Sequence, residues 1–155
     1  MSCLGKNKIL IYFFEFLVSG EKKLWSSKWI FYMSNKEVIE DESYGMKEAH
    51  DETVEAFIVK NNKNVKFLPI GLDVTFPNLK SLNAQSCSIQ KVFYKNLMKL
   101  SKLEKLNLAH NQIHFIGENA IEDLVKLKTL LLNNNQISQI TFTFDSLASL
   151  THLDL

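Results

Sequence analysis

Leucine and other apolar residues recur at fixed intervals in the second half of the chain. Three segments, which start at Leu79, Leu103 and Leu127, align without gaps and lie 24 residues apart. Each has apolar residues at its first, fourth, sixth and eleventh positions, and this alternation predicts a short strand with one buried face. A partial copy starts at Leu150, and a degenerate copy starts at Val54. The repeat predicts that successive strands stack into a parallel sheet, with one strand per turn of a coil.

A second set of apolar residues repeats between the strands, and we expect these segments to form short helices or turns on the opposite side of the coil. Four lysines in the second of them are spaced 4, 4 and 3 residues apart, namely Lys91, Lys95, Lys99 and Lys102. This spacing predicts the solvated face of a short helix whose other face is buried. A surface for phosphates or membranes is the alternative.

The shared pattern L-x-x-L-x-L-x-x-N/C-x-L resembles the leucine-rich repeat, over residues 54–155. The 24-residue length is similar to the typical class of that family, and residues 54–89 look like the first repeats of insect secreted members. The resemblance implies an α/β solenoid, with a short curved parallel sheet on its concave side and short helices or turns on its convex side. It also implies a ladder of ninth-position side chains that bond the backbone of adjacent turns: Asn62, Cys87, Asn111 and Asn135. Cys87 is therefore expected to be buried and structural.

The first 53 residues lie outside this pattern and divide into two segments. In residues 1–20, Lys6 and Lys8 precede an apolar run, and Ser19 and Gly20 follow it, which is the order of a secretory signal peptide. Glu15 within the run opposes a signal, so an apolar segment that caps the solenoid is the alternative.

Residues 21–53 are expected to form an N-terminal cap or linker, although the family's usual four-cysteine cap is absent from the sequence. Their aromatic cluster at Trp25, Trp29, Ile30, Phe31 and Tyr32 is expected to cover Phe57, Val59 and Leu68 in the first turn, and direct ligand contact is the alternative. The repeat domain, residues 54–155, is expected to be open at its C-terminal end.

Composition and motifs exclude several classes of function. The net charge is +1 and all 18 basic residues are lysine, so nothing selects nucleic acid as a partner. His110 and His114 are four residues apart, but in a turn where they would not share a face as metal ligands do. The eight carboxylates from Glu37 to Glu55 lie in a polar run typical of a solvated connection. We therefore expect no enzymatic activity, no metal and no cofactor.

With the phase of the repeat fixed, side chains on the concave face fall into lanes that cross neighbouring strands. The second position alternates acid and base, which predicts a self-neutralised lane: Glu55, Lys80, Glu104, Lys128 and Thr151. Leu131 is apolar at an outward position among hydrogen-bonding side chains, a combination typical of partner-binding patches. The candidate partner-binding residues are Lys105, Asn107, His110, Thr129, Leu131, Asn133, Asn134 and Asp154.

The alternative is that Leu131 is a single exposed leucine without function. The functional interpretation predicts that Leu131→Asp and Asn107→Ala weaken partner binding without lowering the melting temperature.

The sequence thus predicts a non-enzymatic module that binds a protein or peptide ligand, as a secreted or cell-surface recognition protein. Two alternatives stay open: a cytoplasmic scaffold or adaptor, and a fragment of a longer receptor, in which case alone membrane association is expected. Self-association through the uncovered C-terminal edge is a further expectation.

Overall fold

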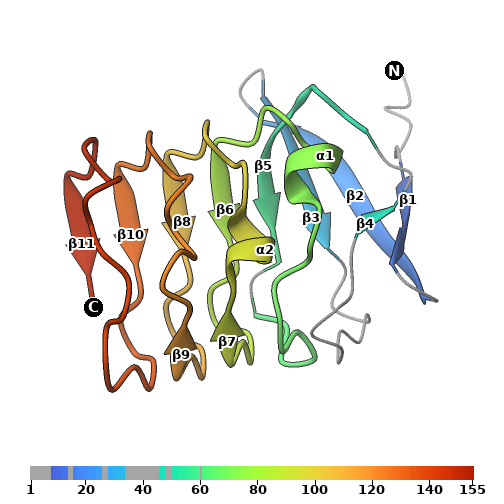
Figure 1. The fold of residues 1–155 in the computed structure, drawn as a ribbon. Helices are drawn as coiled ribbons and strands as arrows, with labels where there is room; N and C mark the ends of the chain where they lie inside the picture. Colours follow the sequence, from blue (N-terminus) through green and yellow to red (C-terminus); the bar gives the residue numbers. More distant parts are fainter. Residues whose placement is uncertain (1–7, 14–15, 26–27, 34–45, 48–49, 60) are drawn as a thin grey trace.

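A computed structural model describes residues 8–13, 16–25, 28–33, 46–47, 50–59 and 61–155. Within these residues the strands form a nine-stranded sheet in the order β11-β10-β8-β6-β5-β3-β2-β1-β4 (Figure 1). Five short strands, one per repeat turn, pair in parallel: β5 (Val54–Ile58), β6 (Ser81–Asn83), β8 (Lys105–Asn107), β10 (Thr129–Leu131) and β11 (His152–Asp154). The predicted parallel-sheet solenoid is confirmed.

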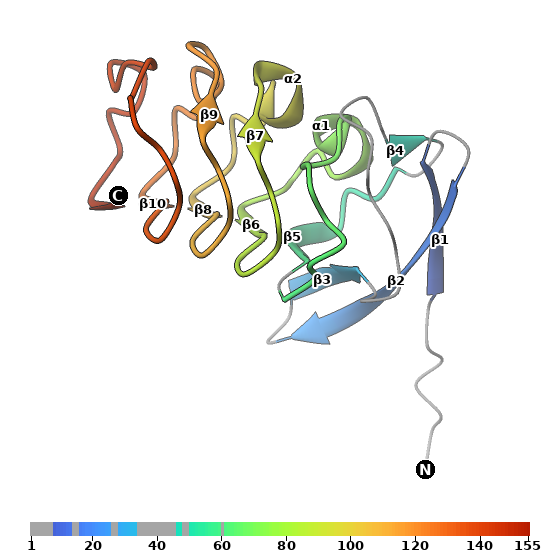
Figure 2. The same ribbon diagram turned by 90° about the horizontal axis from the view of Figure 1, so that it is seen from below.

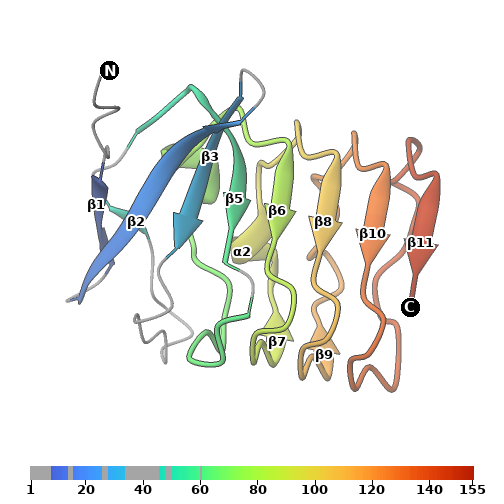
Figure 3. The same cartoon turned by 180° about the vertical axis from the view of Figure 1, so that it is seen from behind.

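The N-terminal residues extend this sheet beyond its first repeat strand. The strand β3 (Lys28–Met33) pairs in parallel with β5, and it is followed outward by β2 (Phe16–Trp25), β1 (Lys8–Phe13) and β4 (Met46–Lys47), which pair antiparallel. Figure 3 shows β3, β2 and β1 continuing the sheet past β5. In the register of β3 and β5, Phe31 lies opposite Phe57.

This pairing bears on the expectations for residues 1–53. The strand β2 runs through Gly20, so the expected boundary between residues 1–20 and 21–53 does not coincide with the end of an element. Removal of residues 1–20 as a signal peptide stays a prediction, as does the cover of the first turn by aromatic side chains. Lys6, Glu15 and much of the acidic run lie outside the described residues.

Opposite the sheet, the chain forms turns, two helices of one turn each and a second small sheet. The helices are α1 (Leu72–Thr75) and α2 (Tyr94–Leu97), and the small sheet pairs β7 (Lys91–Val92) with β9 (Phe115–Ile116). Figure 2 shows the two helices and the large sheet on opposite sides of the coil. No helix in the described part of the chain is long and apolar enough to span a membrane.

The predicted helix with a face of four lysines is wrong. Lys91 lies in β7 and Lys95 lies in α2, whereas Lys99 lies beyond the C-cap residue Met98 and has a left-handed φ of 59°. Neighbouring turns compete for the backbone of this segment: β7 pairs with β9, and Lys91 also bridges to Phe67. Hydrogen bonds between turns therefore replace the i to i+4 bonds that a longer helix would need.

The core lies between the sheet and the convex segments and consists of the repeated apolar positions. Leu82, Leu106 and Leu130 occupy one register position on successive strands, and each is at most 1% exposed. Burying one such side chain contributes about 1.5–3 kcal/mol. Because alternate residues of a strand point to opposite faces, their burial forces the flanking residues onto the solvent side of the sheet. We call this side the sheet face.

Candidate functional site

Strand register arranges the residues of the sheet face into two lanes on either side of the buried leucines. One lane runs from Ala56 through Ser81, Lys105 and Thr129 to His152, and the other runs from Ile58 through Asn83, Asn107 and Leu131 to Asp154. Five of the predicted site residues thus share a surface of three strands: Lys105, Asn107, Thr129, Leu131 and Asp154. The lanes place them in a fixed two-dimensional pattern.

The second-position lane is neutralised in pairs, as predicted. The Nζ of Lys80 lies 2.7 Å from Oε1 of Glu55, and the Nζ of Lys128 lies 2.9 Å from Oε2 of Glu104. The hydrogen bond to Glu55 raises the pKa of Lys80. All four side chains are at least one quarter exposed, so these pairs add little stability, and their main effect is to cancel charge beside the sheet face, where the chain enters the strands.

Lys105 differs from the lysines of that lane. Its side chain is exposed, and among the described residues it has no ion-pair partner. It lies between Ser81 and Thr129 in the register. At the other end of the candidate site, Asp154 is also exposed. The sheet face therefore has a positive position on β8 and a negative position on β11.

Leu131 is half-buried rather than fully exposed, and it lies between Asn107 on β8 and Asp154 on β11. Asn107 already has bonds within the chain: its Oδ1 accepts the N–H of Ala109 at 3.1 Å, and its Nδ2 lies 3.4 Å from Oε1 of Gln85. The first of these bonds fixes the bend that ends β8. Asn107→Ala would remove this bond, so we now expect it to lower the melting temperature as well, unlike the expectation from the sequence.

His110 and Asn134 come after their strands, and both have a left-handed backbone with φ of 57° and 58°. Asn61 and Ser86 occupy the equivalent positions of earlier turns and are also left-handed. Sequence reasoning missed this row, although asparagine and histidine are enriched among non-glycine residues with positive φ. His110 Nε2 and Asn134 Nδ2 lie 3.5 Å apart, and Asn133 is half-buried beside them in the chain. These three residues form the rim of the sheet face.

The ninth-position side chains bond the backbone of the preceding turn. Asn111 accepts the N–H of Ile89 at 3.1 Å and donates to the carbonyl oxygen of Ala84 at 2.9 Å. Asn135 makes the equivalent bonds one turn later, from the N–H of Ile113 and to the carbonyl oxygen of Leu108. Both also donate to carbonyl oxygens of their own turn. Each asparagine therefore ties two turns together where the chain leaves the sheet.

Cys87 and Asn62 occupy the same position in the first two turns. The Sγ of Cys87 lies 2.8 Å from the carbonyl oxygen of Val59, to which it donates, and the residue is fully buried. Burial raises the pKa of its thiol, which keeps it protonated. Asn62 is buried, and its Oδ1 accepts the N–H of Asn64. A protonated thiol can donate a hydrogen bond but is only a weak acceptor. Cys87 therefore does not replace the amide oxygen with which an asparagine accepts a backbone N–H.

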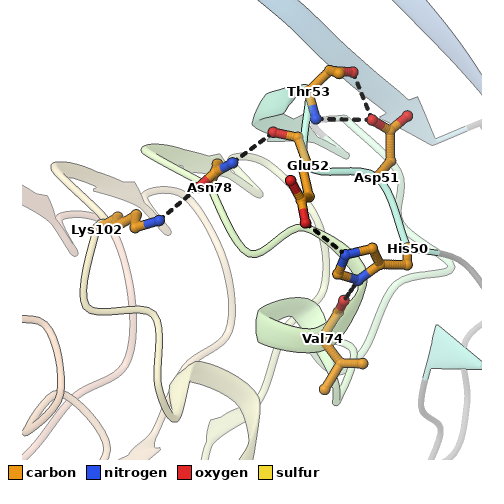
Figure 4. Close-up of polar contacts among 7 residues, drawn as sticks. All are labelled: His50, Asp51, Glu52, Thr53, Val74, Asn78 and Lys102. Carbon is orange, nitrogen blue, oxygen red and sulfur yellow. Dashed lines mark hydrogen bonds and ion pairs between the residues drawn. The ribbon is translucent and has the colours of Figure 1, made fainter.

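A polar cluster that sequence reasoning missed joins the start of β5 to the convex segments (Figure 4). The Nδ1 of His50 lies 2.8 Å from the carbonyl oxygen of Val74 in α1, and its Nε2 lies 3.3 Å from Oε1 of Glu52. The bond to Val74 and then the bond to Glu52 raise the pKa of His50. No motif marked this contact, because His50 precedes the first repeat and lies outside its pattern.

The backbone of the same segment is also tied to later turns. The carbonyl oxygen of Glu52 accepts the Nδ2 of Asn78 at 2.7 Å, and Oδ1 of Asn78 accepts the Nζ of Lys102 (Figure 4). This chain of bonds runs from the segment before β5 through two successive turns. These bonds hold the segment before β5 in place. Within the described residues, no group of histidine, cysteine, aspartate or glutamate side chains is placed to hold a metal ion.

The C-terminal end of the solenoid exposes apolar side chains. Leu153 is 40% exposed, although Leu130 at the same register position of β10 is 1% exposed. A pocket of about 430 Å³ lies at the same end of the solenoid, lined by Leu132, Asn134, Asn135, Ile137, Ser138, Gln139, Ile140 and Leu155. Four of the lining side chains are polar, Asn134, Asn135, Ser138 and Gln139, and the other four are apolar.

Comparison with known proteins places these features in a family. The leucine rich repeat family model matches residues 77–137. The chain is similar to Toll-like receptor 2 type-1 of Gallus gallus, with 47% identity over 55 residues, which are 35% of this chain and 7% of the receptor. It is also similar to a probable serine/threonine-protein kinase of Dictyostelium discoideum, with 35% identity over 69 residues, which are 44% of this chain and 5% of the kinase. The chain thus spans a small part of each relative.

Among solved structures, a chain in the crystal structure of the TLR13-ssRNA13 complex has the same fold, with a TM-score of 0.58 and 23% identity. The match covers 66% of this chain and 15% of that one. These matches do not show the expected likeness to insect proteins. The 24-residue pattern, the parallel solenoid and the family match together show that the chain is a leucine-rich-repeat protein.

Proposed function

We propose that this chain is a non-enzymatic binding module that presents the sheet face over β8, β10 and β11 to a protein or peptide partner. The observation that carries the proposal is the position of Leu131, a half-buried apolar side chain held in register between Asn107 and Asp154. Leucine-rich repeats are a scaffold, so the partner is inferred from this surface and not from the partners of similar proteins.

The partner is proposed to be a protein and not a nucleic acid. TLR13 is described in a complex with single-stranded RNA, and that description concerns TLR13 alone. Beside the sheet face, Lys80 and Lys128 are engaged with carboxylates, and on the face itself Asp154 adds an exposed negative charge. A surface that follows a phosphate backbone needs several unpaired cations, which this arrangement does not provide.

We further propose that the module acts outside the cell, with cytoplasmic action as a scaffold as the alternative. Similarity to a Toll-like receptor supports the extracellular proposal. Sequencing the amino terminus of the mature protein from its natural source distinguishes the two, because cleavage near Gly20 supports secretion and an intact terminus supports the cytoplasmic alternative.

The test of the binding proposal is a selection of displayed peptides on the full-length chain, with peptides of about nine residues, which are long enough to cross three strands. The selected peptides are then measured against two variants. Leu131→Asn removes the apolar contact, and Val125→Asn is a matched control, since Val125 is 47% exposed and lies outside the lanes. We expect Leu131→Asn to weaken binding about tenfold and Val125→Asn to leave it unchanged. Peptides that bind both variants as tightly as the wild type contradict the proposal.

Self-association through the C-terminal end is a second candidate function. It is favoured by the exposed Leu153 and Leu155 beside the pocket. Sedimentation over a range of concentrations tests it: a dimer that Leu153→Asn or Leu155→Asn dissociates supports an interface at this end. A monomer at all concentrations contradicts it.

A further inference from the structure

The charges on the sheet face indicate the chemistry of the partner, an argument that rests on the proposed function. Lys80 and Lys128 have their charges cancelled by Glu55 and Glu104, at 2.7 and 2.9 Å. Lys105 lies between these lysines in the strand order, on β8, and has no ion-pair partner among the described residues. Its exposed ammonium group is therefore free to meet a carboxylate of a partner.

The position of Leu131 sets the spacing of the partner's groups. Lys105 lies opposite Thr129, and Leu131 is two residues further along the same strand. With strands about 4.8 Å apart and a rise of about 3.3 Å per residue, the two backbone positions are about 8 Å apart. In an extended partner, side chains on the same side are separated by one residue and lie about 6.8 Å apart. One acidic and one apolar side chain with a single residue between them can therefore reach Lys105 and Leu131 together.

Asp154 gives this surface a direction. It lies beside Leu131 on β11 and is exposed. A carboxylate placed beyond the apolar side chain would lie near Asp154, where like charges repel each other. The surface therefore favours an acidic group on the β8 side of Leu131 and disfavours one on the β11 side.

We propose that the sheet face between β8 and β11 binds an extended protein segment in which an acidic residue and a large apolar residue are separated by one residue. The carboxylate contacts Lys105, the apolar side chain packs on Leu131, and the position nearest Asp154 is neutral or basic. The polar groups of Asn107 and Thr129 lie between these two contacts in the lanes and face the backbone of the segment.

Each peptide from the selection described above is prepared in three forms, with glutamate, glutamine or lysine in place of its acidic residue. Binding is measured to the full-length chain and to Lys105→Gln, Lys105→Glu and Lys126→Gln. Lys126 is exposed and lies outside the lanes, so Lys126→Gln is a control with the same change in net charge as Lys105→Gln. A thirteen-nucleotide single-stranded RNA serves as a separate probe.

We expect the selected peptides to be enriched in the acidic and apolar pair. Lys105→Gln is expected to weaken the glutamate peptides about tenfold, as for a hydrogen bond to a charged group, and Lys126→Gln to leave them unchanged. Lys105→Glu is expected to bind the lysine peptide more tightly than the glutamate peptide, because the charges of the protein and the peptide are then exchanged.

The other results contradict the inference in distinguishable ways. If Leu131→Asn weakens peptide binding but Lys105→Gln does not, the claim that the partner carries an acidic residue is wrong. The proposed function is then unaffected. Peptides that are indifferent to both residues, or a selection that yields no binding peptide, overturn both. Binding of the RNA that requires Lys105 overturns the choice of a protein partner.

Discussion

Leu131 and Asn107 lie side by side in the register of β10 and β8, but only Asn107 accepts the backbone N–H two residues later, that of Ala109. Asn83, one strand further, makes the same bond to Gln85 at 3.1 Å. The repeat therefore uses asparagine at this position to fix the end of a strand. Leu131 departs from that pattern in the turn where the candidate site is centred.

This relationship predicts that Leu131→Asn leaves the stability nearly unchanged. The variant loses a half-buried leucine but gains an acceptor for the N–H of Asn133, so the free energy of unfolding should change by less than about 1 kcal/mol. Urea denaturation measures the difference. Leu130→Asn is the control, because Leu130 is 1% exposed and a polar group there should cost about 4 kcal/mol. A large loss for Leu131→Asn would contradict its assignment to the sheet face.

Asn111→Ala is predicted to lower the free energy of unfolding by about 3 kcal/mol. The side chain is 8% exposed, and its removal leaves the N–H of Ile89 and the carbonyl oxygen of Ala84 without their partner. Gln112→Ala, at an exposed neighbour, should change it by less than about 0.5 kcal/mol. Equal denaturation midpoints for the two variants would show that the ladder does not stabilise the solenoid.

Cys87 is predicted to resist alkylation in the folded protein. The thiolate is the reactive form, and burial both shields Cys87 and raises its pKa. Mass spectrometry of the Cys87 peptide after iodoacetamide treatment should show modification only when urea unfolds the chain. Rapid labelling without denaturant would mean that this turn opens readily in the native state.

His50 is predicted to make the stability depend on pH. Its pKa is raised in the folded chain, so its contribution is complete below the unfolded pKa of about 6.5 and is lost as the pH rises through the folded pKa. The difference in melting temperature between the wild type and His50→Gln should therefore be larger at about pH 5.5 than at about pH 8. His114→Gln serves as the control. A difference that grows with pH would contradict the bonds to Val74 and Glu52.

The sequence alone predicts the sheet well, because its register follows from the repeated positions. Once Leu82, Leu106 and Leu130 are assigned to the core, the 24-residue spacing places Lys105 beside Thr129 and Asn107 beside Leu131. The pairing of Lys128 with Glu104 follows from the same rule. These contacts are periodic, and a periodic sequence carries them directly.

Contacts that do not follow the 24-residue repeat could not be predicted in this way. The spacing of Lys91 from Lys95 predicts a helix, but the backbone of Lys91 pairs with that of Phe115 in the next turn. The bond from His50 to Val74 joins a residue before the first repeat to a helix within it. Such contacts depend on how the turns stack in space, and local patterns do not encode that.

The most direct test of the binding account is to map the backbone amide shifts of the full-length chain by NMR as a selected peptide is added. The account predicts that the largest changes fall at Lys105–Asn107 and Thr129–Leu131, on the strands that carry Lys105 and Leu131. Changes confined to α2 or to the pocket lined by Ile137 and Leu155 would contradict it, because they would place the partner away from the sheet face.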